Sequence, residues 1–286
     1  LYSSVEAAAA RNIPTVIWAH AYRLFCPDQF FTRDPITECN GNCRECLNGI
    51  FGHAARDNHL AYRNGMRQAN LIIANSEYMA GVIKHHTGRE APVVYPTFDL
   101  DDWRQPGADQ RQHVLFIKPQ ERKGFSIFLD IARALPDRRF IVAGKTTAAA
   151  RRTLNPLDNV ATIDWSNEMR EVYARTEILL GPSIWPEPFG RVFVEAASAG
   201  VPSITSNRGG IPEAVGSGGI LIDDIRDISS WIDAIRSLDD PQIRQTLSTR
   251  ARRHAGIFSS AIIGAQLREA VLHATGLDLD TGATRN

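Results

Sequence analysis

From residue 113 onward, short apolar runs alternate with amphipathic stretches along the chain. The apolar runs are rich in β-branched residues and are bounded by Gly, Pro or Asp, as is typical of buried parallel strands. We predict strands over 113–118, 139–144, 160–164, 177–183, 202–206 and 218–223. We predict helices over 124–135, 146–153, 168–175, 189–199 and 211–215. This alternation indicates a doubly wound α/β domain.

The first hundred residues show a sparser pattern. We predict strands over 14–20, 71–76 and 92–96, and helices over 4–11, 53–69 and 77–86. Three strands are too few for a freestanding doubly wound sheet, because an edge would lack a partner and the core would be thin. We therefore expect the first half of this domain to lie upstream of Leu1.

These patterns predict three regions in the chain. Residues 1–103 form a partial N-terminal domain with a cysteine-containing loop at 21–52, and residues 104–257 form the second domain. Residues 258–286 form a last helix that crosses back to the first domain, followed by a frayed tail.

Composition narrows the classes of partner. The 286 residues include 32 Lys plus Arg and 32 Asp plus Glu, so no global field attracts nucleic acid or an anionic membrane. No stretch approaches the roughly 18 uninterrupted apolar residues of a membrane span. We expect a cytoplasmic protein. If its acceptor is linked to a lipid, we expect the protein to contact the inner face of the membrane peripherally.

Two glutamates in "PEPFGRVFVEAASAG" lie where a predicted strand leads into a helix. The flanking prolines fix the backbone of Glu187 in an extended form, and the helix N-terminus offers N–H groups for an anion. Glu195 follows about 8 Å further along the helix axis. A nucleotide sugar, with hydroxyls at both ends and phosphates between, fits this arrangement. The alternative is a carboxylate that stabilises the helix dipole and a second that is solvated.

Two lysines lie at the same predicted edge of the sheet. Lys118 and Lys123, in "KPQERKG", follow the first strand of the second domain. Lysines on such a loop can neutralise a diphosphate, although a solvated charge cluster is the more common explanation of the lysines taken alone. Lysines, glutamates and a helix terminus at one edge together favour the phosphate site.

These motifs resemble those of a large family of retaining glycosyltransferases with the GT-B fold. That family is glycosyltransferase family 4, also described as group 1. The resemblance rests on the E-x7-E spacing, on "KPQERKG", and on the Gly-Gly-x-Pro-Glu loop in "SNRGGIPEAV". "PTVIWAH" is similar to the strand that ends in an active-site histidine, and "IIANSEYMA" to a strand-to-helix turn of the family. The implied fold is α/β, with two facing Rossmann-like domains of which the N-terminal one is incomplete.

The resemblance implies a role for each site residue. Glu187, Lys118, Lys123 and His20 are implied to act at the transferring sugar and the leaving diphosphate. The donor-binding residues that it implies are Glu195, Phe189, Gly190, Arg191, Ile163, Asp164, Trp165 and Ser183. Glu195 would accept hydrogen bonds from the ribose, and the backbone around Ile163 to Trp165 would meet the nucleobase. Arg208, Gly209 and Gly210 are implied on the acceptor side.

The predicted function is metal-independent transfer of a hexose, with retention, from a nucleotide-diphosphate sugar to a saccharide or lipid-linked acceptor in cell-surface glycan synthesis. The alternatives are a nucleotide-sugar epimerase or hydrolase of the same fold, or a non-catalytic nucleotide-sugar-binding protein. Two features depart from the family: Lys118 stands where Arg is usual, and the N-terminal glycine-rich loop is absent. We therefore expect this chain alone to be weakly active or inactive.

All four cysteines fall in one irregular segment, at Cys26, Cys39, Cys43 and Cys46. Their clustering and the C-x2-C spacing favour a structural zinc site. Reduced thiols, two disulfides and an iron–sulfur cluster are the alternatives. No cofactor is expected for catalysis itself.

Overall fold

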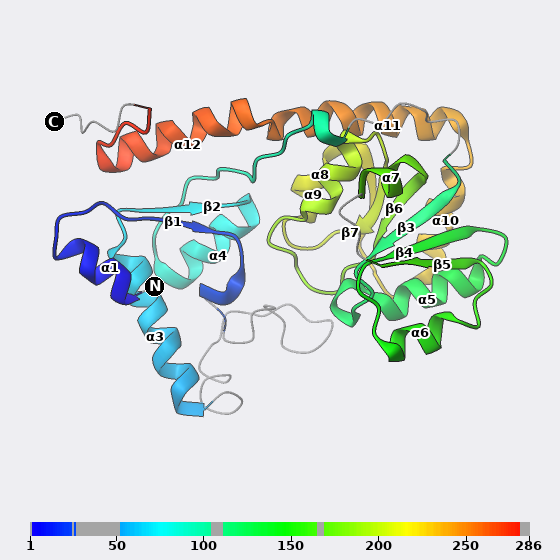
Figure 1. Ribbon diagram of the computed structural model, residues 1–286, viewed down its shortest axis with the longest axis horizontal. Helices are drawn as coiled ribbons and strands as arrows, with labels where there is room; N and C mark the ends of the chain where they lie inside the picture. Colours follow the sequence, from blue (N-terminus) through cyan, green and yellow to red (C-terminus); the bar gives the residue numbers. More distant parts are fainter. Residues whose placement is uncertain (1, 25, 27–51, 104–110, 165–168, 281–286) are drawn as a thin grey trace. The chain divides into compact units, whose positions relative to one another are not determined.

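The computed structural model of the protein describes residues 2–24, 26, 52–103, 111–164 and 169–280. The chain forms two compact units, unit 1 with residues 1–97 and 260–286 and unit 2 with residues 98–259 (Figure 1). This division falls earlier than the boundary we predicted at 103/104. Phe98 joins unit 2 because its N–H donates to the carbonyl of Phe258 at 3.1 Å and the two rings meet edge to face.

Unit 2 contains a six-stranded parallel sheet, as the sequence predicted. Its strands are β3 (His113–Ile117), β4 (Arg139–Ala143), β5 (Val160–Ile163), β6 (Thr176–Gly181), β7 (Ser203–Ser206) and β8 (Gly219–Ile222). Their spatial order is β5-β4-β3-β6-β7-β8. The chain therefore winds outward in one direction from β3 and in the other from β6, which is the doubly wound topology.

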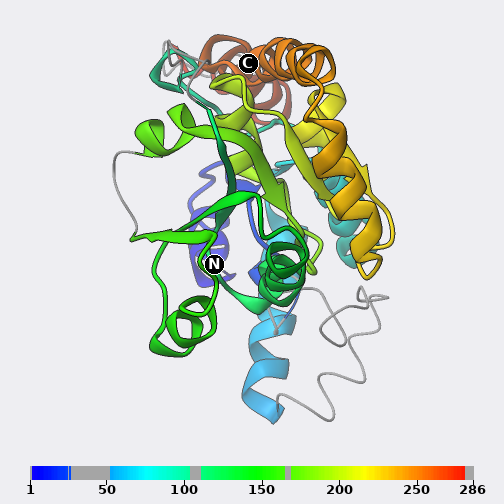
Figure 2. The same cartoon turned by 90° about the vertical axis from the view of Figure 1, so that its right-hand side faces the viewer.

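Helices cover both faces of this sheet (Figure 2). They are α5 (Phe125–Ala134), α6 (Ala148–Leu154), α7 (Met169–Ala174), α8 (Arg191–Ser198), α9 (Ile211–Val215), α10 (Ile228–Ser237) and α11 (Pro241–Ala255). Short 3-10 turns are η2 (Asp101–Trp103), η4 (Glu121–Lys123), η5 (Gly216–Gly218) and η6 (Gly256–Phe258). Helix α5 packs against α10, whereas α8 packs against α11. Stacked rings of Phe116 and Phe128, 4.6 Å apart, fill the core beneath α5.

Unit 1 is built around two parallel strands, β1 (Val16–Ala19) and β2 (Leu71–Ala74). Its helices are α1 (Tyr2–Ala9), α3 (Gly52–Gln68), α4 (Glu77–Thr87) and α12 (Ser260–Thr275), and a 3-10 turn, η1, spans Tyr22–Leu24. Helix α12 closes the core, because Ile263 and Val271 pack against Leu71, Ile73 and Val94. Within the described residues, no helix has the length and apolar character to cross a membrane.

The predicted strand over 92–96 is wrong in extent. Only Val93 pairs with β2, through an isolated parallel bridge to Ala74. Pro92 and Pro96 flank this bridge and have no N–H to donate, so the ladder cannot extend through them.

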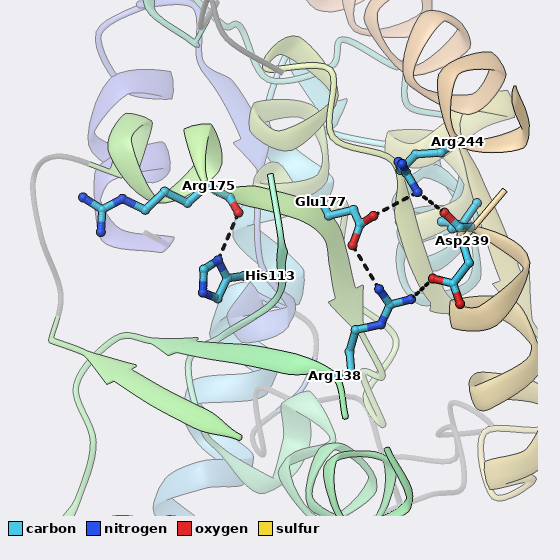
Figure 3. Close-up of polar contacts among 7 residues, drawn as sticks. His113, Arg138, Arg175, Glu177, Asp239 and Arg244 are labelled. Atoms are coloured by element: carbon cyan, nitrogen blue, oxygen red, sulfur yellow. Dashed lines mark hydrogen bonds and ion pairs between the residues drawn. The ribbon is translucent and has the colours of Figure 1, made fainter. Parts of the chain in front are cut away.

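An ion network joins α11 to the amino end of the unit 2 sheet (Figure 3). Glu177 in β6 is 8% exposed and accepts from Arg138 at 3.2 Å and from Arg244 at 2.9 Å. Arg138 also pairs with Asp239, at the start of the turn into α11. One buried carboxylate therefore holds two guanidinium groups that come from different parts of the chain.

Removing that carboxylate should destabilise unit 2. We expect Glu177→Ala to lower the free energy of unfolding by about 3 kcal/mol, because two partly buried guanidinium groups lose their shared partner. Asp239→Asn is the matched control and should cost less than about 1 kcal/mol, since the Asp239 side chain is 58% exposed. Urea unfolding measures both changes, and equal losses in the two variants would contradict this account of the network.

His86 in α4 is buried, and its ring is neutral near pH 7. Burial, together with the positive charges of His85, Arg63 and His59, lowers the pKa of His86 from 6.5 to about 4. In the unfolded chain the same ring takes up a proton near pH 6.5. Between these values the unfolded state binds more protons, so the His86 contribution to stability is complete above pH 6.5 and is lost as pH falls toward 4.

The pH dependence of stability should therefore be weaker in a variant without this ring. Between pH 7 and pH 5, wild type should lose about 2 kcal/mol more unfolding free energy than His86→Gln, at 1.36 kcal/mol per pH unit. Chemical denaturation at both pH values gives the comparison, in which all other titrating groups are common to the two proteins. Parallel pH profiles would show that the pKa of His86 is the same in the folded and unfolded states, which would contradict this account.

Candidate functional site

The winding direction of the unit 2 sheet reverses between the carboxyl ends of β3 and β6, and we call this switch point the crevice. Ligands of doubly wound folds bind at this point. Lys118 follows β3 directly and has a φ of 61°, a left-handed conformation that is uncommon for a residue with a side chain. Its N–H donates to the carbonyl of Ala143 at 2.8 Å, which fixes this turn.

The loops after β3 and β6 are joined to each other. The carbonyl of Arg122 accepts the N–H of Ile184 at 2.9 Å and that of Trp185 at 3.2 Å. Gly124, at a φ of 82°, lies so close to Pro182 that a Cβ there would overlap the proline carbonyl. The two loops are therefore held together, and we call these joined segments, residues 118–124 and 182–187, the ledge.

An ion pair between a buried carboxylate and a partly buried ammonium group lies on this ledge. Lys123 Nζ is 2.7 Å from Glu187 Oε1, and the two side chains are 17% and 8% exposed. The ammonium group also lies 5.4 Å from the centre of the Trp185 ring, and the Arg122 guanidinium lies 5.3 Å from the same ring. The sequence predicted both charged residues at this edge, and the structure places them in direct contact.

Gly209 and Gly210 pack closely against the backbone of the loop that carries Glu187. The N–H of Gly210 donates to the carbonyl of Glu187 at 2.7 Å. Gly209 has a φ of 59°, and a Cβ there would lie 2.6 Å from the carbonyl carbon of Pro186. Both glycines are required where two backbone segments approach this closely, so their first role is to position Glu187.

Helix α8 begins at the crevice with Gly190 as its N-cap, at a φ of 105° and without a side-chain cap. Its opposite end is well satisfied. Arg111 donates to the carbonyl of Gly200 at 2.9 Å and to that of Ala199 at 2.6 Å, and the Ser248 hydroxyl donates to Gly200 at 2.7 Å. Positive charge at the C-terminus complements the helix dipole and leaves the positive N-terminal end directed at the crevice.

Glu195 lies on α8, further into the crevice. Burial raises the pKa of this carboxyl, although Arg191, the Tyr173 hydroxyl and Lys118 act in the opposite direction. The Tyr173 hydroxyl lies 3.2 Å from Glu195 Oε2. Two carboxylates, two ammonium groups and a helix N-terminus therefore gather at one edge of the sheet.

Residues 111–240 match the sequence model of the glycosyl transferases group 1 family. This segment contains β3 to β8 and every unit 2 residue that the sequence predicted for the site.

Two curated relatives extend the comparison. A D-inositol 3-phosphate glycosyltransferase of Mycolicibacterium smegmatis is 29% identical over 223 residues, which cover 68% of this chain and 50% of that protein. Spore coat protein SA of Bacillus subtilis is 35% identical over 91 residues, 31% of this chain and 24% of that protein. The chain thus spans about half the length of the first relative and less of the second.

Solved structures share the fold. The crystal structure of Anabaena HepE in complex with UDP superposes with a TM-score of 0.75 at 21% identity, covering 95% of this chain and 76% of that chain. Sucrose-phosphate synthase from Thermosynechococcus elongatus gives a TM-score of 0.71 at 18% identity, with coverages of 95% and 71%. The predicted α/β fold with parallel, Rossmann-like sheets is confirmed. That the two domains face each other stays a prediction.

Several predicted donor-binding residues contact the protein itself. The ring of Phe189 is buried against Phe258, with centroids 5.3 Å apart, so only its backbone can meet a ligand. The Arg191 guanidinium lies 4.4 Å from the centre of the Phe98 ring. The Ser183 hydroxyl lies 3.3 Å from the carbonyl of Trp185 and supports the loop. Ligand contacts of these residues stay predictions.

The predicted nucleobase region is described in part. The carbonyl of Ile163 accepts the N–H of Gly144 at 2.9 Å, and Gly144 lies against Lys118. Asp164 is exposed and pairs with Arg151 at 2.8 Å. Trp165 lies outside the described residues.

The remaining predictions are placed as follows. Arg208 donates to the carbonyl of Ile184, so its side chain supports the ledge. His20 follows β1 in unit 1, is exposed, and has its ring 4.8 Å from that of Trp18. Cys26 is half-buried, whereas Cys39, Cys43 and Cys46 lie outside the described residues, so the zinc site stays a prediction.

Sequence reasoning missed Tyr173, Arg111 and Ser248. Each acts through a contact between distant parts of the chain, and none stands in a recognisable motif. The one available signal was the position of Tyr173 in the helix before β6, which the doubly wound topology places beside α8.

The close approach behind Glu187 predicts the effect of one methyl group. We expect Gly209→Ala to lower the unfolding free energy by about 1–3 kcal/mol, because the Cβ strains the backbone and meets the Pro186–Glu187 peptide. Gly81→Ala is the matched control, since a Cβ at Gly81 meets nothing within 4 Å. Thermal and chemical unfolding of both variants tests this, and equal stability of the two would contradict the packing described.

Proposed function

We propose that the protein containing this chain is a glycosyltransferase that moves a sugar from a nucleoside-diphosphate sugar to a saccharide or lipid-linked acceptor. The observation that carries this proposal is the gathering of Lys118, the Lys123–Glu187 pair, Glu195 and the N-terminus of α8 at the switch point of the sheet. The match of residues 111–240 to glycosyl transferases group 1 supports it.

The cations at this edge suit a departing diphosphate. Negative charge develops on that group as the glycosidic bond breaks, and fixed positive groups lower the barrier. Lys118, Lys123 and the end of α8 supply such charge, and we propose that the reaction uses them in place of a metal ion. UDP bound to Anabaena HepE supports a nucleoside diphosphate as the donor moiety here.

The two carboxylates suit the two ends of the donor. We propose that Glu195 accepts hydrogen bonds from the ribose and that Glu187 accepts them from the transferring sugar. Transfer then proceeds with retention by front-face displacement, in which a diphosphate oxygen takes the proton of the acceptor hydroxyl. We assign Arg208 and the Gly209-Gly210 turn to the acceptor side, and His20 to the transferring sugar. Where the acceptor is lipid-linked, the protein would work at the inner face of the membrane.

The donor and the reaction can be tested together. A thermal-shift panel of UDP-glucose, UDP-N-acetylglucosamine, GDP-mannose and ADP-glucose on the full-length protein should give one clear stabilisation. Release of free nucleotide that requires an added acceptor supports transfer. Release without an acceptor indicates a hydrolase, conversion of the sugar without release indicates an epimerase, and binding without turnover indicates a non-catalytic protein. Each of these three outcomes contradicts the proposal.

Substitution of the carboxylates should separate binding from turnover. Glu195→Ala should weaken nucleotide binding roughly ten- to a hundredfold, because hydrogen bonds to a charged group contribute about 1.5–3 kcal/mol. Glu187→Ala should lower kcat more than nucleotide affinity. Calorimetry and steady-state kinetics measure the two effects, and Glu171→Ala, at an exposed position of α7, serves as a control glutamate of the same domain. Wild-type behaviour of both site variants would exclude this site assignment.

A further inference from the structure

A tyrosine outside all of the sequence motifs contacts the candidate nucleoside-binding carboxylate. Tyr173 lies on α7, and its hydroxyl is 3.2 Å from Glu195 Oε2 and 3.3 Å from the carbonyl of Val192. Val192 and Glu195 are three positions apart, so both acceptors lie on the same face of α8.

The tyrosine ring is fixed in place. Tyr173 is completely buried, and the edge of its ring meets Trp103 with the centroids 5.7 Å apart. Trp103 belongs to η2, which packs against α8, and Arg170 on α7 lies 4.0 Å from Asp102 of the same turn. A hydroxyl on a ring this constrained can serve only acceptors within its reach, which are Glu195 and Val192.

The Tyr173 hydroxyl leaves most lone pairs of the Glu195 carboxylate available to accept hydrogen bonds from a ligand. A phenol has one proton to donate, whereas a carboxylate has about four lone-pair sites on its two oxygens. When the proton is directed at Glu195 rather than at the carbonyl of Val192, the bond occupies one of these sites and holds the Glu195 side chain in one orientation. The remaining lone pairs can accept the paired hydroxyls of a ribose without further reorganisation.

We propose that Tyr173 is a positioning residue that orients the Glu195 carboxylate for the ribose hydroxyls of the nucleotide. This inference rests on the proposed function, in which Glu195 binds the nucleoside. Preorganisation of this kind raises affinity because the bound rotamer is already populated in the free protein.

The electrostatics of the crevice agree with this role. Burial raises the pKa of Glu195, and the described groups that counter it are Arg191 on the same helix, Tyr173 on α7 and Lys118 after β3. Loss of the tyrosine hydroxyl removes one of these three. The carboxylate should then take up a proton at higher pH, and it accepts hydrogen bonds less well in that form.

A double-mutant cycle tests the proposal in the full-length protein. We expect Tyr173→Phe to raise the Kd for the nucleoside diphosphate that binds, chosen among UDP, GDP and ADP, roughly three- to tenfold by loss of one charge-assisted hydrogen bond. In the Glu195→Ala background the same substitution should change the Kd less than twofold. A change of roughly that size lies within the deviation seen when two substitutions act independently. The acid limb of the binding profile should also move to higher pH in Tyr173→Phe.

The outcomes separate this inference from the proposed function. If Glu195→Ala leaves nucleotide binding unchanged, the proposed function of the site fails. If Glu195→Ala weakens binding but Tyr173→Phe does not, or weakens it equally in both backgrounds, Tyr173 has only a packing role and this inference is overturned. Tyr22→Phe, which alters a buried tyrosine of unit 1, is the control and should leave the Kd unchanged.

Discussion

Parallel pairing of β3 with β6 is the constraint on which the candidate site depends. The two strands are neighbours in space, although β4 and β5 lie between them in the chain. Because both run the same way, their carboxyl ends bring the Lys118–Lys123 loop and the Glu187 loop to one point. Hydrogen bonds to the carbonyl of Arg122 and the contact of Gly124 with Pro182 then join the loops. Without this strand order, no charged residue of one loop could meet the other.

The two ends of helix α8 differ in charge, and its N-terminal end lies at the crevice. Its last carbonyls accept the N–H groups of residues 199–201, Arg111 and Ser248 bind the carbonyls just beyond its end, and its N-terminus carries no side-chain cap. Burial, with the nearby Arg252, lowers the pKa of Arg111, but an arginine guanidinium is still a cation at neutral pH. The helix is thus neutralised at the end remote from the crevice and keeps its positive end for an anion.

The sequence was sufficient for the sheet and for the residue types of the site, and insufficient for their contacts. Strands β3 to β8 were predictable because each is a short apolar run between turn residues. The segment over 92–96 failed because Pro92 and Pro96 end the ladder, although its apolar pattern suits a strand. The Lys123–Glu187 pair and the Tyr173–Glu195 contact follow from strand order and side-chain packing, which no local pattern encodes.

The two site carboxylates differ in the partner that holds them, and this difference bears on their proposed roles. Glu187 is paired with a cation at 2.7 Å, whereas Glu195 is contacted by a neutral hydroxyl at 3.2 Å. Separating a buried ion pair leaves two charges to be satisfied, so a ligand that takes Lys123 must also satisfy Glu187. A diphosphate alone satisfies only the ammonium group, while a diphosphate that carries a sugar offers hydroxyls to the carboxylate as well. In the proposed function, the ion pair would therefore favour an intact nucleotide sugar, whereas the hydroxyl contact would leave lone pairs of Glu195 for the ribose.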